Sequence, residues 1–159
     1  MPTKFIYTLF LALLIALFVG LGIDAFYPGP VAPRYPVELD IVKSGCEETL
    51  EQQKIRKDYN LARDKFIEES KPYNRNVSII SLIASIIILV LSLTLLSKIS
   101  MIADGILLGG VFTVMYCIIR GLMSESSQFR FVIVTIGLAI ALVLGYIKFI
   151  RPKNNPLQN

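Results

Sequence analysis

The stretch Ala103–Gly121 reads ADGILLGGVFTVMYCIIRG, and it predicts a membrane-spanning helix against which other helices pack. It is apolar over most of its length, although it carries Asp104 and Arg120. Gly105 and Gly109 have the G-x-x-x-G spacing, which lets two helices approach closely in lipid because neither residue has a side chain. We therefore expect both glycines to face another helix, from the same chain or from a second copy.

The rest of the chain contains apolar stretches of similar length. They are Phe5–Tyr27, Val77–Leu96 and Phe131–Ile147, beside Ile99–Ile119 in the middle of the chain. Each is close to the roughly 20 residues that a helix needs to cross about 30 Å of hydrocarbon. The predicted fold class is an all-α polytopic membrane protein, a four-helix transmembrane bundle with one further amphipathic extracytoplasmic helix. Its spans are expected within residues 1–27 and 77–150, and residues 151–159 form a polar tail.

The formal net charge of +4 does not indicate nucleic-acid binding, because the excess cations are not one patch. Residues 28–76 contain nine basic and nine acidic side chains and are neutral overall. The excess cations flank the apolar stretches, as topology signals do. They are Lys4, Lys98, Arg120, Arg130, Lys148, Arg151 and Lys153.

No catalytic or metal-binding constellation is visible in the sequence. There is no histidine, which removes the commonest acid–base catalyst and the commonest metal ligand. Cys46 lies in the polar segment and Cys117 lies deep in the third apolar stretch, so we expect no disulfide between them. We expect a protein that is not an enzyme and that binds no cofactor or metal.

Rows of small residues recur in the other apolar stretches and indicate tight helix packing. Two rows have a spacing of four residues, and a third set is a serine stripe at heptad positions. These residues are Ala12, Ala16, Gly20, Gly137, Ala141, Gly145, Ser78, Ser81, Ser85 and Ser92. The serine stripe favours packing with hydrogen bonds between helices, although a polar stripe is also compatible with a water path.

Residues 28–76 are predicted to lie outside the membrane and to contain a helix at about residues 46–71. Ile55, Tyr59, Ala62 and Phe66 share one face, which forms either a coiled-coil-like seam or a face that lies on the rest of the protein. Pro72 should break or bend this helix before the second span.

The charges beside the apolar stretches predict which side of the membrane the termini occupy, but different charges favour different sides. The first apolar stretch has the amino terminus and Lys4 before it and mostly acids after it, and three cations follow the last stretch. Both observations favour cytoplasmic termini, whereas the cations of residues 28–76 favour the reverse. We give more weight to the charges beside the membrane. The first stretch is interpreted as an uncleaved anchor, with a cleaved signal peptide as the alternative.

The isolated charges are expected at the membrane borders. Asp24 either has a functional role or lies at headgroup level, and Asp104 is expected near the opposite surface. Arg120 should border the extracytoplasmic headgroups beside Asp24 if the first and third spans are neighbours. Glu125 is placed to neutralise Arg120 or Arg130.

Two pieces of the chain, FVGLGIDAFYP at residues 18–28 and ADGILLGG at residues 103–110, resemble stretches of small uncharacterised bacterial four-span inner-membrane proteins. The resemblance covers the first and third apolar stretches. It implies a bacterial inner membrane and the same four-helix plan, and it implies no activity.

Two functions are compatible with these features. The first is a non-enzymatic structural or accessory subunit, in contact with the lipid bilayer and with a protein partner or a second copy of the chain. It would bind through its extracytoplasmic helix and its packing faces. The second is a small channel or transporter whose polar path uses Asp24, Asp104, Arg120 and the serine stripe. The sequence lacks the broken helices and internal repeats of typical transporters.

Overall fold

The computed structural model describes residues 2–39, 49–95 and 100–147. This part of the chain is all-α, with four long helices and one short 3₁₀ helix. They are α1 (Pro2–Phe26), η1 (Val37–Leu39), α2 (Leu50–Leu95), α3 (Ser100–Leu122) and α4 (Ser127–Gly145). All four α-helices are long and apolar enough to cross a membrane. The prediction of an all-α protein with four helices of span length and composition is confirmed. Cys46, the turn before Ser100 and the polar tail lie outside the described residues.

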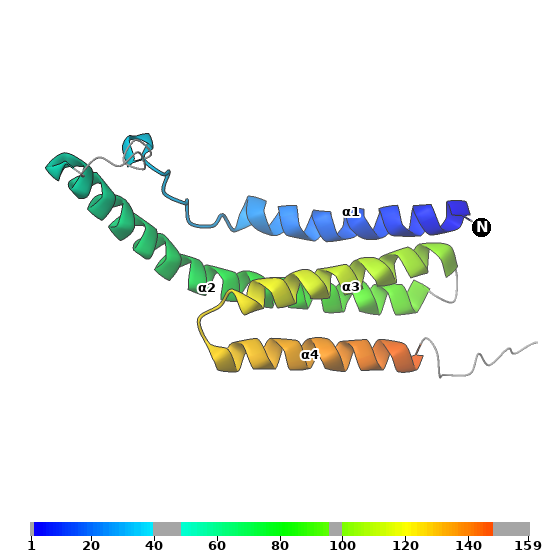
Figure 1. The fold of residues 1–159 in the computed structure, drawn as a ribbon. Helices are drawn as coiled ribbons and strands as arrows, with labels where there is room; N and C mark the ends of the chain where they lie inside the picture. Colours follow the sequence, from blue (N-terminus) through cyan, green and yellow to red (C-terminus); the bar gives the residue numbers. More distant parts are fainter. Residues whose placement is uncertain (1, 40–48, 96–99, 148–159) are drawn as a thin grey trace, which may run out of the picture.

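The helix α3 is the centre of the arrangement. It packs against α2 most extensively, then against α1, and then against α4. Figure 1 shows α1 and α4 on opposite sides of the pair formed by α2 and α3. Contact between α1 and α2 is slight, and in the described ranges α4 packs directly on α3 alone. The helices therefore surround α3 and do not close into a ring.

The amphipathic segment is not a separate helix, which corrects the prediction for residues 46–71. From Leu50 it is the first half of α2, which runs without interruption through Pro72 to Leu95. The two halves are inclined to each other, and the first half extends away from the other helices (Figure 1). Proline removes one helical hydrogen bond and crowds the preceding turn, so we attribute the bend to Pro72. We call residues 50–71 the arm.

The connector after α1 covers the apolar stripe of the arm. Tyr35 contacts Tyr59 edge to face, with ring centroids 5.4 Å apart. Leu39 in η1 is buried, and η1 packs on α2. Ile55 and Phe66 are half-buried on the same face. Tyr59 is also half-buried, whereas Ala62 of the same stripe is exposed, so the stripe lies on the rest of the protein in part.

Buried hydroxyl groups join α2 to α3. The stripe Ser78, Ser81, Ser85 and Ser92 is fully buried. The Ser78 hydroxyl donates to the Cys117 carbonyl at 2.8 Å, and the Ser92 hydroxyl donates to the Ala103 carbonyl at 2.8 Å. Ser92 follows Ser78 by 14 residues in α2, whereas Ala103 precedes Cys117 by 14 residues in α3. The two helices therefore run antiparallel, and both hydrogen bonds fit a single alignment of one helix along the other.

The glycines of α3 lie where neighbouring side chains come closest. A Cβ atom added to Gly105 would lie 2.7 Å from Leu11 Cδ2, and one added to Gly109 would lie 2.9 Å from Ile15 Cβ. Both neighbours belong to α1. On the opposite side of α3, a Cβ at Gly110 would lie 2.6 Å from Leu89 Cδ2 of α2. Because these three glycines have no side chain, α1 and α2 can both approach the backbone of α3 closely.

The small-residue rows of the outer helices are used only in part. In α1, Ala12 is fully buried and Ala16 is half-buried, but a Cβ added to Gly20 would meet nothing within 4 Å. Within the part of the chain that the structure describes, no neighbouring helix uses Gly20, and its packing role, which could involve a partner chain, stays a prediction.

In α4, only the first residue of the row lies at a helix contact. A Cβ at Gly137 would lie 2.8 Å from Ile118 Cδ1, whereas one at Gly145 would meet nothing within 4 Å of it, and Ala141 is exposed. An apolar groove of about 310 Å³ separates α4 from α2 along this stretch, with Leu89 and Ile140 among its lining residues. Among the described residues α4 has one neighbouring helix, so Ala141 and Gly145 pack on no other helix of this chain, and their packing role against a partner chain stays a prediction.

Candidate functional site

A polar cluster forms around Arg120, in the last turn of α3. The Arg120 Nε donates to the Tyr116 hydroxyl at 3.0 Å, and its Nη1 donates to Asn74 Oδ1 at 2.9 Å. Its Cζ lies 5.4 Å from the centroid of the Tyr116 ring and 5.8 Å from that of Tyr73. Asn74 and Tyr73 belong to α2, next to Pro72. The guanidinium is therefore fixed between two helices.

The end of α1 is joined to the same cluster through Tyr27. Its ring stacks on Tyr73 with centroids 5.4 Å apart and planes 9° from parallel. Its hydroxyl accepts a hydrogen bond from Asn76 Nδ2 at 2.9 Å. Two residues later, a Cβ added to Gly29 would lie 2.9 Å from the Tyr73 ring, so a side chain there would push the connector off α2.

A cavity of about 460 Å³ opens beside the Arg120 guanidinium, where α1, α2 and α3 meet. Its lining residues come from these helices, the connector and the loop after α3. They are Asp24, Gly29, Pro30, Phe66, Ser70, Tyr73, Asn74, Arg120 and Met123. We call it the Arg120 cavity. Asp24 is exposed, so the cavity reaches the surface of the protein.

Asp24 and Arg120 share this cavity, as expected if α1 and α3 are neighbours. They are not a direct ion pair, however, since among the described residues no nitrogen–oxygen distance of 4.0 Å or less joins them. The hydrogen-bond partners of Arg120 are Asn74 and Tyr116, which corrects the predicted pairing. The amide and phenol are close enough to bond directly, whereas the carboxylate lies on another part of the cavity wall.

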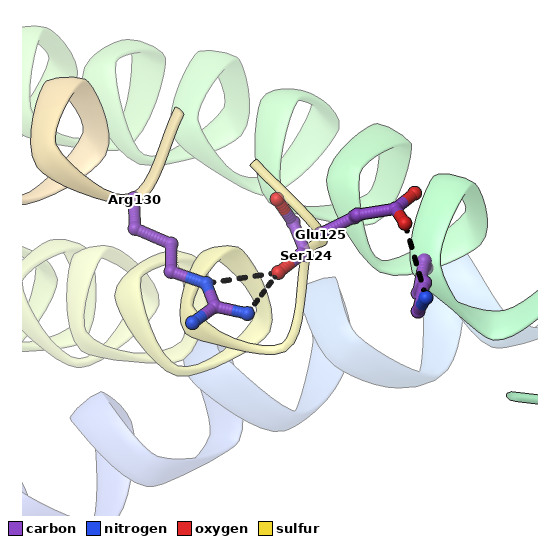
Figure 2. Close-up of polar contacts among 4 residues, drawn as sticks. Ser124, Glu125 and Arg130 are labelled. Carbon is purple, nitrogen blue, oxygen red and sulfur yellow. Dashed lines mark hydrogen bonds and ion pairs between the residues drawn. The ribbon is translucent and has the colours of Figure 1, made fainter. Parts of the chain in front are cut away.

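The loop between α3 and α4 is held by a different set of contacts. Glu125 Oε1 lies 3.1 Å from Lys71 Nζ, and the Arg130 guanidinium donates from Nε and Nη2 to the Ser124 carbonyl (Figure 2). The predicted pairing of Glu125 with Arg120 or Arg130 is therefore replaced by a pair with the arm. The Ser126 side chain accepts from the backbone N–H of Phe129 and caps α4.

The other predicted polar residues do not reach the Arg120 cavity. Asp104 is half-buried near the start of α3, 16 residues before Arg120 and so at the other end of the helix. The serine stripe lies in the interface between α2 and α3. Its hydroxyls donate to backbone carbonyls, among them those of Leu82 and Ser78 for Ser85 and Ser81.

Sequence reasoning missed the residues that hold Arg120 in place. Tyr116 precedes Arg120 by four residues, the spacing at which side chains meet on a helix, and this was a usable signal. Nothing in one sequence connects Tyr27, Tyr73 or Asn74 with Arg120, because they are distant along the chain and meet only through the packing of three helices.

Comparisons of this chain with protein families, curated proteins and solved structures find no match. The resemblance to bacterial four-span membrane proteins stays a prediction. By the length and composition of its helices, the chain is a multi-span membrane protein.

Proposed function

We propose that this protein is a non-enzymatic structural or accessory subunit of a membrane assembly, and that the arm binds its protein partner. One observation carries the proposal. The span α2 continues past Pro72 as an uninterrupted helix that extends away from the other helices (Figure 1). A helix continuous with a transmembrane span holds its outer surface at a fixed distance and direction from the bilayer.

The outer face of the arm has the features of a contact surface. Leu50 and Leu61 are 87% and 61% exposed. They are 11 residues apart, which places them within about 20° of each other around a helix of 3.6 residues per turn. Tyr59, on the face covered by the connector, lies roughly opposite Leu61. The connector thus uses one face of the arm and leaves the other to a partner.

Charged and polar side chains surround Leu61. They line a shallow hollow of about 290 Å³, together with Leu61 itself, and are Gln53, Arg56, Lys57, Asn60 and Asp64. Two of the charged groups are basic and one is acidic, so the face is not the strongly cationic surface that binds anionic lipid or nucleic acid. A protein surface with an apolar centre and a mixed polar rim is the complementary partner.

The charges beside the apolar stretches favour one orientation in the membrane. We propose that the arm is extracytoplasmic, that both termini are cytoplasmic and that the membrane is a bacterial inner membrane. The orientation is supported by Lys4 in the first turn of α1 and by the cations Lys148, Arg151 and Lys153. The bacterial inner membrane is supported by the resemblance of residues 18–28 and 103–110.

The channel alternative has weaker support. A water path along the serine stripe needs hydroxyls that face a lumen, whereas these are buried between α2 and α3 and donate to carbonyls. Asp104 and Arg120 lie at opposite ends of α3. The contacts therefore favour the serine stripe as helix packing.

A photo-crosslinking residue tests the proposed contact. The residue is placed at Leu61 of the full chain and activated in cells. We expect one discrete protein adduct, and its mass shows whether the partner is a different protein or a second copy of this chain. Leu138 of α4 is 59% exposed in an apolar span and is the matched control, at which we expect lipid adducts only. Lipid or no adduct at Leu61 would overturn the proposal.

A second variant tests the same contact without a reactive group. Leu61→Asp should abolish copurification of the crosslinked protein in mild detergent, while the exposed position leaves the folded yield unchanged. For the orientation, Ala62→Cys in a Cys46→Ser background should react with a membrane-impermeant maleimide in intact cells, because Ala62 is exposed and lies about 100° around the arm from Leu61. Cys117 is buried and supplies no background.

A further inference from the structure

We propose that the Arg120 cavity binds a zwitterionic phosphate–ammonium group, the chemistry of a phosphoethanolamine headgroup. In this arrangement the phosphate binds the Arg120 guanidinium and the ammonium binds the Asp24 carboxylate. The inference does not depend on the partner of the arm.

The guanidinium is positioned for an anion before any ligand binds. Nε and Nη1 are held by Tyr116 and Asn74, and among the described residues Nη2 donates to no protein group. The neighbouring rings of Tyr73 and Tyr116 further restrict the plane of the group. A guanidinium presents its donors in a planar fork that matches the oxygens of a phosphate, and its position here is fixed by two helices.

A negative charge elsewhere in the lining of the Arg120 cavity selects the other half of the ligand. Asp24 lines the cavity but makes no direct ion pair with Arg120 among the described residues, so one cation and one anion face the same space. A purely anionic ligand would be repelled by the Asp24 carboxylate. A primary ammonium offers three N–H donors to that carboxylate, whereas the quaternary ammonium of choline offers none.

The remaining wall fits the rest of such a ligand. Pro30, Phe66 and Met123 give the cavity an apolar side for methylene groups. Its volume of about 460 Å³ lies within the roughly 300–1,000 Å³ of small-molecule sites. It lies where the apolar stretch of α1 ends at Tyr27 and that of α3 ends at Arg120, the level at which tyrosines and headgroups meet.

The test is the lipid retained by the purified full chain. The protein is reconstituted with equimolar phosphatidylethanolamine, phosphatidylglycerol and phosphatidylcholine, extracted in mild detergent, and analysed by native mass spectrometry. We expect retained phosphatidylethanolamine to exceed each of the other lipids about tenfold, the ratio that one additional charge-assisted contact supports. Asp24→Asn should remove this preference and raise the share of phosphatidylglycerol.

The control variant is Glu38→Gln, which makes the same charge change at an exposed residue of η1 outside the cavity. It should retain the lipids of the unmodified protein. The thermal stability of both variants is measured to show that they are folded; Asp24 is exposed, so we expect no loss of folding.

Free phosphoethanolamine distinguishes the source of the ligand. If the bound group belongs to a lipid, millimolar phosphoethanolamine should displace phosphatidylethanolamine only weakly. If the protein retains no preferred lipid but phosphoethanolamine raises its melting temperature, and Asp24→Asn abolishes the rise, the site takes the soluble zwitterion. Absence of both effects, or a lipid preference unchanged by Asp24→Asn, overturns the proposal.

Discussion

The helices α3 and α4 contain small residues at the same spacing, but only α3 uses that spacing for packing along its length. Gly105 and Gly109 of α3 face Leu11 and Ile15 of α1 at distances that no Cβ atom would tolerate without movement. In α4, Gly137 faces Ile118, whereas Gly145 faces open space. A row of small residues permits close approach, and the presence of a neighbouring helix decides whether the approach occurs.

The largest loss of stability should come from placing a large side chain in the glycine row of α3. Gly109→Leu forces a large side chain against the Ile15 Cβ, which is attached directly to the backbone of α1 and cannot rotate away. We expect a loss of about 3 kcal/mol in the free energy of unfolding, the upper part of the usual range for overpacking. Unfolding in mixed detergent with the folded fraction measured by gel mobility gives this value.

The matched variant of that experiment is Gly145→Leu, which should change the free energy of unfolding by less than about 0.5 kcal/mol. Equal losses in the two variants would mean that α4 is enclosed by other helices and that the contrast between the rows is wrong.

The arginines at the two helix ends should give the next largest effect. Arg120 bonds side chains from two helices, whereas Arg130 at the start of α4 bonds a loop carbonyl. We expect Arg120→Gln to cost about 2 kcal/mol, because it removes hydrogen bonds to a charged group between helices. Arg130→Gln should cost less.

A double-mutant cycle identifies the partner of Arg120. For Arg120→Gln combined with Asn74→Ala, the loss in the free energy of unfolding should be about 1 kcal/mol smaller than the sum of the two single losses. The same cycle with Asp24→Asn should be nearly additive, since no direct pair joins the two groups. A larger coupling to Asp24 than to Asn74 would restore the ion pair that the sequence suggested.

The smallest effect should separate hydroxyl bonds between helices from those within one. Ser92 on α2 donates to the Ala103 carbonyl of α3, whereas Thr135 donates to the Phe131 carbonyl four residues earlier in α4. Ser92→Ala should cost about 0.6 kcal/mol, the average for hydrogen bonds between membrane helices. Thr135→Ser keeps the hydroxyl of α4 and should leave the stability unchanged, as measured by the same unfolding assay.

The features that sequence reasoning predicted depend on local composition. Four apolar stretches of sufficient length predict four spans, and glycines within Ala103–Gly121 predict that this helix receives its neighbours. Serines at heptad positions in the second span predict a buried stripe. Each inference uses residues of one helix, so the sequence contains all the information it needs.

The features that it missed depend on how separate segments meet. Pro72 predicts a break or a bend equally well, and the continuous helix depends on a tertiary setting that tolerates a lost hydrogen bond. The Arg120 cavity combines residues of three helices and a connector. The loose packing of α4 follows from the absence of a second neighbour in the described structure, which no spacing within α4 reveals.

The central place of α3 has a consequence for biosynthesis. α1 and α2 leave the ribosome before α3, and they contact each other only slightly. Until α3 enters the bilayer, the hydroxyls of Ser78 and Ser92 lack the carbonyls of Cys117 and Ala103, and Leu11 and Ile15 of α1 lack the glycines of α3 that they contact. A nascent chain that ends before α3 is therefore the form that membrane proteases and insertion factors are expected to recognise as incomplete, and the arrival of α3 ends that state.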